Sequence, residues 1–211
     1  MKLGDIKIEA LKMMFVSYGE NLTIDNIANY ADDENFSSYL VKMNGSINRC
    51  FADLERKGIV PERVRTLTEE DGTARGQYSD FYLDTLRMTR LVRVAYENER
   101  GVRISNFDAY EYVPEEKRLI ARKIGEGECY KITYRPLLER IKETNGDDYE
   151  IDLPDTIASM IPFYIKGDLY AEDEPSEASE ARNWYEAAME ELMNDAASGG
   201  YVNSVYSLAN I

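Results

Sequence analysis

The sequence of 211 residues contains no histidine and only two cysteines, and both shortages limit the chemistry it can perform. Without an imidazole, serine–histidine and cysteine–histidine catalysis are excluded, and so are histidine-ligated metal sites. Cys50 and Cys129 lie far apart, and neither belongs to a CxxC pair. A zinc site or a disulfide framework is therefore not expected, and Cys50, which falls in an apolar stripe, is interpreted as a small buried residue.

Long hydrophobic runs are missing as well. No uninterrupted apolar segment approaches the roughly 20 residues that a membrane-spanning helix needs. Met1 to Asp5 carries one lysine, and the apolar run that follows is broken by Lys7, Glu9 and Lys12. We therefore expect no signal peptide, no membrane association and a soluble product inside the cell that makes it.

Basic residues are few relative to acidic ones: 25 Lys and Arg against 40 Asp and Glu give a formal net charge of −15. Specific binding to duplex DNA is not expected, because it requires basic side chains that neutralise phosphates. An acidic surface is compatible with facing DNA without adhering to it, although ordinary solubility also explains the charge. A hydrophobic content of 44% indicates a folded chain with one sizeable core, or one core plus an inserted subdomain.

The N-terminal part has the three- and four-residue apolar spacing of amphipathic helices. One helix is predicted from Ile6 to Tyr18, and a short helix is predicted to follow it. A longer helix carries an apolar stripe from Phe36 to Leu54 and is predicted to end at Gly58. Gly45, in its middle, weakens this helix by roughly 1 kcal/mol relative to alanine, so tertiary packing must hold it.

Between Val64 and Arg135 the apolar period changes to two, which indicates half-buried strands. We predict an antiparallel meander of about four strands, separated by polar and glycine-containing turns. The step Gly125-Glu126-Gly127 is predicted to be a hairpin turn, because it lacks the third glycine and the following helix of a phosphate loop. The alternating stretches are Val92–Tyr96, Tyr110–Tyr112 and Tyr130–Arg135, with Leu119–Ala121 as a further candidate.

Helical spacing returns after a polar turn at Asn145 to Asp148. Pro162 removes a backbone donor, so the segment up to Tyr170 is predicted to be either one kinked helix or two helices that meet at Ile161. A last helix is predicted to begin with Pro175 in its first turn. Its predicted apolar face consists of Ala181, Trp184, Tyr185, Ala188 and Leu192.

These patterns predict an α+β fold, in which N- and C-terminal helices form one helical bundle core with an inserted antiparallel β-rich subdomain. The predicted divisions are 1–62 for the N-terminal helices, 63–136 for the insertion, 137–197 for the C-terminal helices and 198–211 for an extended docking tail. Because this tail is rich in apolar residues, it is expected either to fold back on its own domain or to pack on a partner.

Neighbouring carboxylates are the remaining candidates for chemistry. The groups Asp32-Asp33-Glu34, Asp147-Asp148 and Asp173-Glu174 lack the spacing of a calcium-binding loop. The first and last of them coincide with predicted helix starts, where acidic residues favour the helix dipole. We therefore expect no catalytic residue, no cofactor, no metal and no enzyme. A carboxylate-dependent hydrolase stays open as a remote alternative, because sequence does not show whether two carboxylates share a cleft.

The region from Ile151 to Leu192 resembles the head–tail adaptor, or connector, proteins of tailed bacteriophages. A DLP entry, the segment IPFYIKGDLYAEDEP and an alanine-rich helix with an aromatic pair and an EEL step carry the resemblance. The order of helices followed by a β-rich insertion that ends in a TYRP step also fits that family. The matching residues are Asp152–Pro154, Ile161–Tyr164, Asp168–Tyr170, Glu172–Glu174 and Trp184–Glu186.

The resemblance implies a non-enzymatic structural protein of the virion neck, synthesised in the host cytoplasm. Such adaptors assemble as a homo-oligomeric ring, commonly of twelve subunits, and bind the portal protein and the tail or neck proteins. DNA passes through the channel of the ring without specific binding, which fits the acidic composition. No cofactor and no membrane contact is implied.

The resemblance also implies two sets of contact residues. The C-terminal tail would dock on the portal, and the last helices would pack between neighbouring subunits of the ring. The candidate portal-docking residues are Tyr201, Val202, Val205, Tyr206, Leu208 and Ile211. The candidate inter-subunit residues are Tyr164, Leu169, Tyr170, Trp184 and Tyr185.

A second interpretation belongs to a different class of protein. The chain would be a non-viral intracellular interaction module that uses its C-terminal tail to bind a partner, for example by adding a strand to an exposed sheet edge. Neighbouring genes for a portal or a major capsid protein would favour the adaptor. A metal-dependent activity lost on substitution of one acidic pair would favour the hydrolase.

Overall fold

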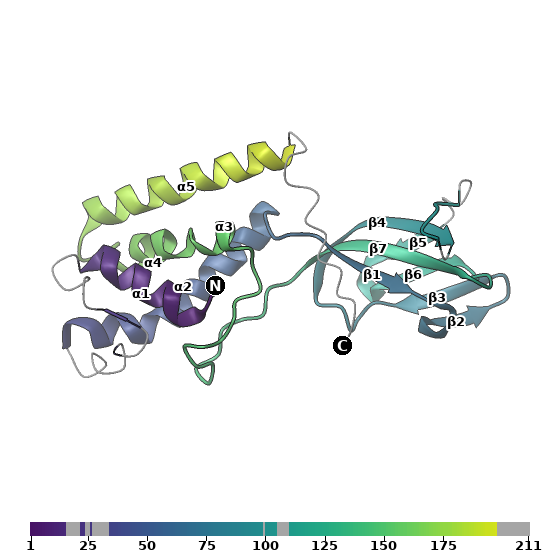
Figure 1. Ribbon diagram of the computed structural model, residues 1–211, viewed down its shortest axis with the longest axis horizontal. Helices are drawn as coiled ribbons and strands as arrows, with labels where there is room; N and C mark the ends of the chain where they lie inside the picture. Colours follow the sequence, from purple (N-terminus) through teal and green to yellow (C-terminus); the bar gives the residue numbers. More distant parts are fainter. Residues whose placement is uncertain (16–21, 24–25, 27–33, 99, 105–109, 198–211) are drawn as a thin grey trace. The chain divides into compact units, whose positions relative to one another are not determined.

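The computed structural model describes residues 1–15, 22–23, 26, 34–98, 100–104 and 110–197 (Figure 1). Within the described residues, the chain forms two compact units: the first combines Met1–Ile59 with residues 138–197, and the second is Val60–Leu137. The first unit is helical and the second consists of antiparallel strands, so the predicted α+β class is confirmed. The second unit starts three residues before the predicted insertion and ends one residue after it.

Two long helices from the N-terminal part belong to the helical unit: α1 (Leu3–Met14) and α2 (Glu34–Lys57). The sequence predicted that this first helix continues beyond Met14. That prediction is wrong at Phe15, whose φ of −124° and ψ of 67° are outside helical geometry. The short helix predicted next lies outside the described residues. The end of α2 is as predicted: Gly58 has φ 70°, a left-handed conformation that costs glycine little.

The C-terminal part of the helical unit contains α3 (Asp155–Ala158), α4 (Ile161–Leu169) and α5 (Pro175–Ala197). Pro162 lies in the first turn of α4, where a missing amide proton is tolerated, so the alternative of two helices is confirmed. Helix α4 packs against α1, α2 and α5 and so lies at the centre of the unit (Figure 1). Among the described residues, no helix is long and apolar enough to span a bilayer.

The helical unit is held together by apolar side chains that all three long helices and α4 contribute. Each fully buried leucine, isoleucine or phenylalanine stabilises the fold by about 1.5–3 kcal/mol. Fully buried examples are Leu3, Ile6, Leu11, Phe36, Met43, Ile47, Leu54, Ile161, Ile165 and Met189.

The β unit contains two antiparallel sheets rather than the single meander of about four strands that the sequence predicted. One sheet has the order β1-β7-β4 and the other the order β2-β3-β6-β5. The predicted number of strands was too low because β1, β2 and β3 are short and largely polar, without a clear apolar alternation. The strands are β1 (Arg63–Leu67), β2 (Gly72–Arg75), β3 (Tyr78–Tyr82), β4 (Met88–Asn98), β5 (Tyr110–Val113), β6 (Arg118–Arg122) and β7 (Glu128–Pro136).

Strand β4 departs from strict alternation. Its pairing with β7 shifts register twice, between Met88 and Arg90 and between Leu91 and Arg93. Val92 lies at the second shift and is 40% exposed, whereas Val94 and Ala95, in the regular pairing that follows, are both buried. A bulge of this kind inserts an extra residue and re-aims the side chains around it.

The step Gly125-Glu126-Gly127 is a tight turn, as predicted, but it is not a hairpin. It connects β6 to β7, and these strands belong to different sheets. Gly127 has φ 71°, and the amide of Glu128 donates to the carbonyl of Gly125 at 3.1 Å. The turn therefore carries the chain from one sheet to the other.

Both sheets contribute to one shared core. Phe81 from β3 and Tyr130 from β7 meet across the sheets with ring centroids 5.8 Å apart. The tyrosine hydroxyl donates to the carbonyl of Arg122 at 3.1 Å, so its polar end is satisfied. The remaining core residues are Leu67, Leu83, Leu86, Met88, Val94, Tyr96, Leu119, Ala121, Ile124, Ile132 and Tyr134.

Candidate functional site

Two of the three acidic groups that the sequence offered as possible chemistry contain a residue with a structural partner, and Asp32 and Asp33 of the other group lie outside the described residues. Asp147 accepts a hydrogen bond from Lys7 Nζ at 2.9 Å, and its backbone carbonyl accepts the amide of Gly4 at 2.8 Å. Asp173 accepts the hydroxyl of Tyr39 at 2.9 Å. Within the described residues, no group of three or more Cys, Asp or Glu side chains could hold a metal ion.

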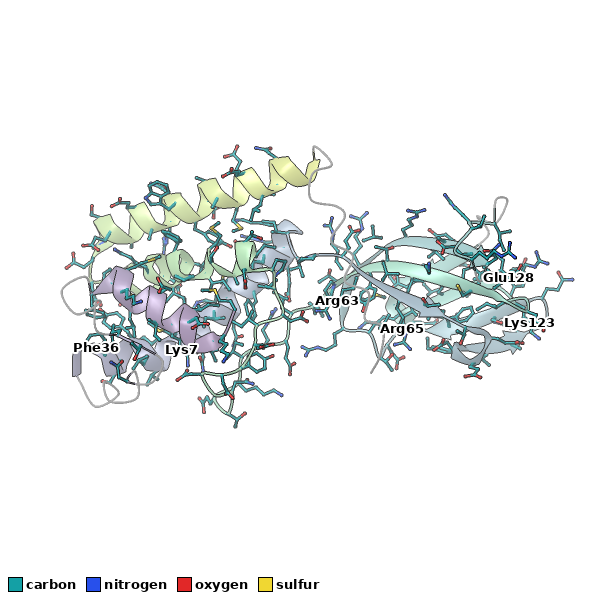
Figure 2. All side chains as sticks on the ribbon, in the orientation of Figure 1. Lys7, Phe36, Arg63, Arg65, Lys123 and Glu128 are labelled. Carbon is teal, nitrogen blue, oxygen red and sulfur yellow. The ribbon has the colours of Figure 1, made fainter. Side chains whose placement is uncertain are left out.

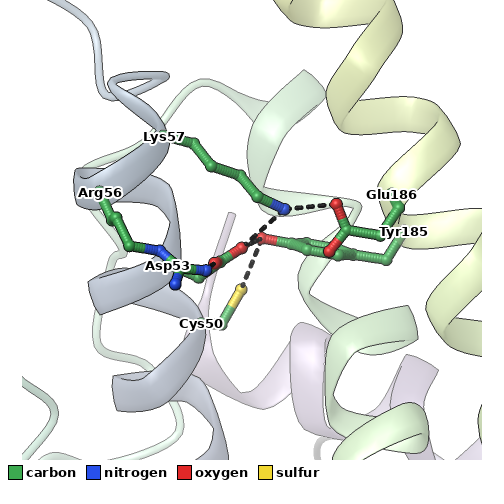
Figure 3. A network of polar contacts seen from close by, with 6 residues as sticks. All are labelled: Cys50, Asp53, Arg56, Lys57, Tyr185 and Glu186. Atoms are coloured by element: carbon green, nitrogen blue, oxygen red, sulfur yellow. Dashed lines mark hydrogen bonds and ion pairs between the residues drawn. The ribbon is translucent and has the colours of Figure 1, made fainter.

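A polar network joins α2 to α5 and contains a thiol, two carboxylates and an ammonium group (Figure 3). The hydroxyl of Tyr185 donates to Asp53 Oδ2 at 2.9 Å. Lys57 Nζ lies 2.9 Å from the same oxygen and 2.6 Å from Glu186 Oε2, so it bridges the two helices. The ammonium group also lies 4.9 Å from the centroid of the Tyr185 ring, within range of a cation–π interaction.

The electrostatics of this network favour a structural role. Burial raises the pKa of Cys50 to about 12 and raises that of Tyr185 well above its ordinary value. Burial alone would also raise the pKa of Asp53, but hydrogen bonds from Lys57, Arg56 and Tyr185 outweigh it and lower that pKa. At neutral pH the thiol and the phenol are therefore protonated and the carboxylate is charged. This combination fixes the two helices together rather than preparing a nucleophile.

The five predicted inter-subunit residues do not lie on one surface. Tyr170 and Tyr185 are buried in the helical unit, and the hydroxyl of Tyr170 donates to the carbonyl of Met14. Tyr164 and Leu169 are half-buried. Only Trp184 is largely exposed, at 61%.

The apolar face predicted for α5 is therefore wrong at Trp184. The residues that α5 buries are Ala178, Ala181, Tyr185 and Met189. Trp184 lies one residue, or 100°, before Tyr185 around the helix, and the network to Asp53 orients Tyr185 inward. The six predicted portal-docking residues, Tyr201 to Ile211, lie outside the described residues.

The exposed tryptophan belongs to a stripe along the outer face of α5. Glu180, Trp184, Ala187 and Glu191 recur at intervals of four, three and four residues, which places them on one side of a helix. All four are exposed, and in the described part of the chain neither glutamate has an ion-pair partner. We name these four residues the α5 stripe.

The β unit carries a surface of opposite sign, which the sequence reasoning missed. On the outer face of the sheet β1-β7-β4, Arg90 lies directly opposite Arg135, and Arg93 lies opposite Thr133. Lys131 is two residues along β7 on the same face. We name these five residues the basic sheet face.

Charge is divided unequally between the two units. Val60–Leu137 contains 14 Lys and Arg and 14 Asp and Glu, whereas the rest of the chain contains 11 and 26. The whole net charge of −15 therefore belongs to the helical unit and the segments continuous with it. Counting charges by predicted domain would have shown this division, but the register that gathers the basic residues on one face is not a local property of the sequence.

No protein-family model matches this sequence, and no curated protein matches it either.

Proposed function

We propose that the protein is a head–tail adaptor, a structural virion protein that forms a ring between portal and tail and lines the DNA exit channel. The observation that carries the proposal is the 61% exposure of Trp184, the single tryptophan, within the segment that resembles this family. The other aromatic residues of that segment are buried or half-buried in their own unit.

Most of the matching residues contribute to packing within the helical unit. Asp168 accepts a hydrogen bond from Arg49 Nε at 3.1 Å, which ties α4 to α2. Tyr170 and Tyr185 bond to the N-terminal helices through their hydroxyls. Trp184 contributes little to this packing. Tryptophan is enriched among the residues that dominate binding at protein interfaces, so an exposed one on an ordered helix supports a docking role.

The division of charge supports the channel part of the proposal. If the helical unit faces the channel, its excess of carboxylates repels the phosphates of the passing DNA and keeps the genome from adhering. The neutral β unit would contribute little to that field. In this arrangement the tail residues Tyr201, Val202, Val205, Tyr206, Leu208 and Ile211 dock on the portal.

The proposal is tested by mixing the purified chain with the portal protein encoded in the same genome. We expect negative-stain images to show an added ring on the portal, and co-sedimentation to show stoichiometric binding. A chain lacking Gly199 to Ile211 should keep its circular dichroism spectrum and its melting temperature but lose portal binding.

Two outcomes would contradict this proposal. If the full chain does not bind the portal, the adaptor assignment fails, and the alternative of an interaction module for another partner is then preferred. If the truncated chain still binds, the ring can stand but the docking role of the tail fails.

A further inference from the structure

The basic sheet face contains an arrangement that costs stability in the isolated chain. Arg90 on β4 and Arg135 on β7 are directly opposed, and like charges in that position repel. Glu62 Oε1 lies 3.6 Å from Arg135 Nε, and Glu97 Oε2 lies 2.6 Å from Lys131 Nζ. These two cations therefore have partners. Arg90 and Arg93 are exposed, and within the described ranges neither has an ion-pair partner. The face therefore presents two free guanidinium groups to an anionic ligand.

Carboxylates of a protein fit this face better than the phosphates of DNA. Appreciable DNA affinity comes from several phosphate contacts, typically about 6–10 in well-studied repressors, whereas this face offers two unpaired cations. The chain as a whole also carries a net charge of −15, which repels nucleic acid. A guanidinium group instead pairs well with a single carboxylate, because both are planar and can form two parallel hydrogen bonds.

The α5 stripe supplies those carboxylates. Glu180 and Glu191 are exposed, have no ion-pair partner within the described ranges, and flank Trp184. The two glutamates are about 16 Å apart along the helix axis at 1.5 Å per residue. Arg90 and Arg93 are about 10 Å apart along β4, and their long side chains can reach the wider spacing. Val92 lies between the arginines and is 40% exposed, so it offers an apolar contact for the indole ring.

From this complementarity we infer that the basic sheet face of one copy binds the α5 stripe of a second copy. The two surfaces lie on different units of the chain, so each copy presents one of each, and the contact is head-to-tail. A head-to-tail contact closes into a ring when the rotation per subunit permits it. The inference rests on the proposed self-assembly and assigns two surfaces to it.

Charge reversal on each surface provides the test. One variant carries Arg90→Glu and Arg93→Glu, and the other carries Glu180→Arg and Glu191→Arg. In the first variant both surfaces are negative, and in the second both are positive. Control variants Arg75→Glu and Glu143→Arg each make one reversal of the same kind, at exposed positions without an ion-pair partner in the described chain, and the single reversals Arg93→Glu and Glu180→Arg are compared with them. Association of the full-length chains is measured by sedimentation velocity over a concentration series at low and high salt.

We expect the unmodified chain to associate, and more strongly at low salt. Each reversed variant alone should associate at least about 10-fold more weakly, the change that corresponds to 1.4 kcal/mol. An equimolar mixture of the two should regain association, because every contact between unlike copies is then complementary. The controls should match the unmodified chain. Recovered association in the mixture would also show that the two surfaces bind between copies, because a contact within one chain would not be restored by mixing.

Three results would overturn the inference: no association of the unmodified chain, full association of either reversed variant alone, or no recovery in the mixture. Binding of a fluorescent DNA duplex that depends on Arg90 and Arg93, in place of self-association, would assign the face to nucleic acid instead. If reversed variants still form a ring on the portal, this inference fails while the adaptor proposal stands. If the mixture of reversed variants regains association but no chain binds the portal, this inference stands while the adaptor proposal fails.

Discussion

The hydroxyl of Tyr185 in α5 donates a 2.9 Å hydrogen bond to the carboxylate of Asp53 in α2, across 132 positions of sequence. The phenol is almost fully buried, and the carboxylate also binds Lys57 and Arg56. Together with the burial of Ala178, Ala181 and Met189, this contact keeps one face of α5 turned inward and leaves Trp184 in solvent. The exposed side of α5 that carries Trp184 is thus adjacent to a buried side that this hydrogen bond helps to hold in place.

Replacement of Tyr185 by phenylalanine should lower the free energy of unfolding by about 1–2 kcal/mol, because the ring still packs on Tyr164 while the buried hydrogen bond is lost. Urea denaturation followed by circular dichroism measures the change. Tyr39→Phe is a matched control, since its hydroxyl bonds to Asp173 at an exposed site and its loss should cost less. Equal stability of Tyr185→Phe and the unmodified chain would contradict a structural role for the network.

Acid should destabilise both units. The pKa of Asp53 in the helical unit and that of Asp71 in the β unit are lowered below the ordinary value of 3.8. For Asp71, burial alone would raise the pKa, but hydrogen bonds from Thr68 and Arg65 outweigh it. A carboxyl group with a lowered folded-state pKa contributes stability above its unfolded-state pKa, and that contribution is lost as pH falls through the folded-state value.

Stability should therefore be constant with respect to these two groups above about pH 5 and should fall below about pH 4. Urea denaturation at a series of pH values measures it. Asp53→Asn should be less stable than the unmodified chain at neutral pH, and the difference should shrink in acid. A difference that stays the same at all pH values would show that the charge of Asp53 does not matter.

Two glycines in helices should respond to alanine in opposite directions. Gly45 in α2 is exposed, and a methyl group there would meet only Arg49 Nη1 at 3.6 Å. Gly45→Ala should therefore stabilise the chain by up to about 1 kcal/mol through helix propensity.

Gly167 in α4 is buried against α5, where a methyl group would lie 2.7 Å from Arg182 Cγ and 3.3 Å from the carbonyl of Ala178. Gly167→Ala should destabilise the chain by about 1–3 kcal/mol, because α4 and α5 would have to separate. Melting temperatures of both variants test the pair together. A stabilised Gly167→Ala variant would show that the helices can move apart without cost.

The two thiols should differ in reactivity towards a thiol reagent such as DTNB. Cys50 is fully buried and its pKa is raised to about 12, so it should react only when the helical unit opens. Cys129 is half-buried in β7, and burial raises its pKa as well, so it should react slowly in the native state. Labelling of Cys50→Ala and Cys129→Ala variants assigns each phase. Rapid native labelling of Cys50 would contradict its burial.

The single tryptophan should report on docking. As Trp184 is 61% exposed, acrylamide should quench its fluorescence efficiently in the isolated chain. Quenching should decrease when the chain assembles, since the ring would then be covered by a partner surface. Trp184→Phe, which keeps an aromatic ring, should weaken assembly less than Trp184→Ala. Unchanged quenching in an assembled sample would place Trp184 away from any contact.

Features set by local chemistry could be predicted from the sequence. Gly58 ends α2 because its left-handed conformation is available to glycine, and Pro162 separates α3 from α4 because it lacks an amide proton. The α+β class follows from the change of apolar period near Val64. The net charge and its concentration outside the β unit are likewise present in the residue order alone.

Features that depend on distant partners could not be predicted in this way. The turn at Gly125-Glu126-Gly127 looks like a hairpin, but the pairing of β6 and β7 with other strands makes it a passage between two sheets. The facing of Arg90 and Arg135 depends on the register of β4 and on its bulges. Trp184 lies within 100° of the buried face of α5, so spacing along the chain could not separate it from Tyr185. Packing and the hydrogen bond to Asp53 determine that Tyr185 is the buried residue. Only one side of the helix can pack against the core, and a buried hydroxyl needs an acceptor.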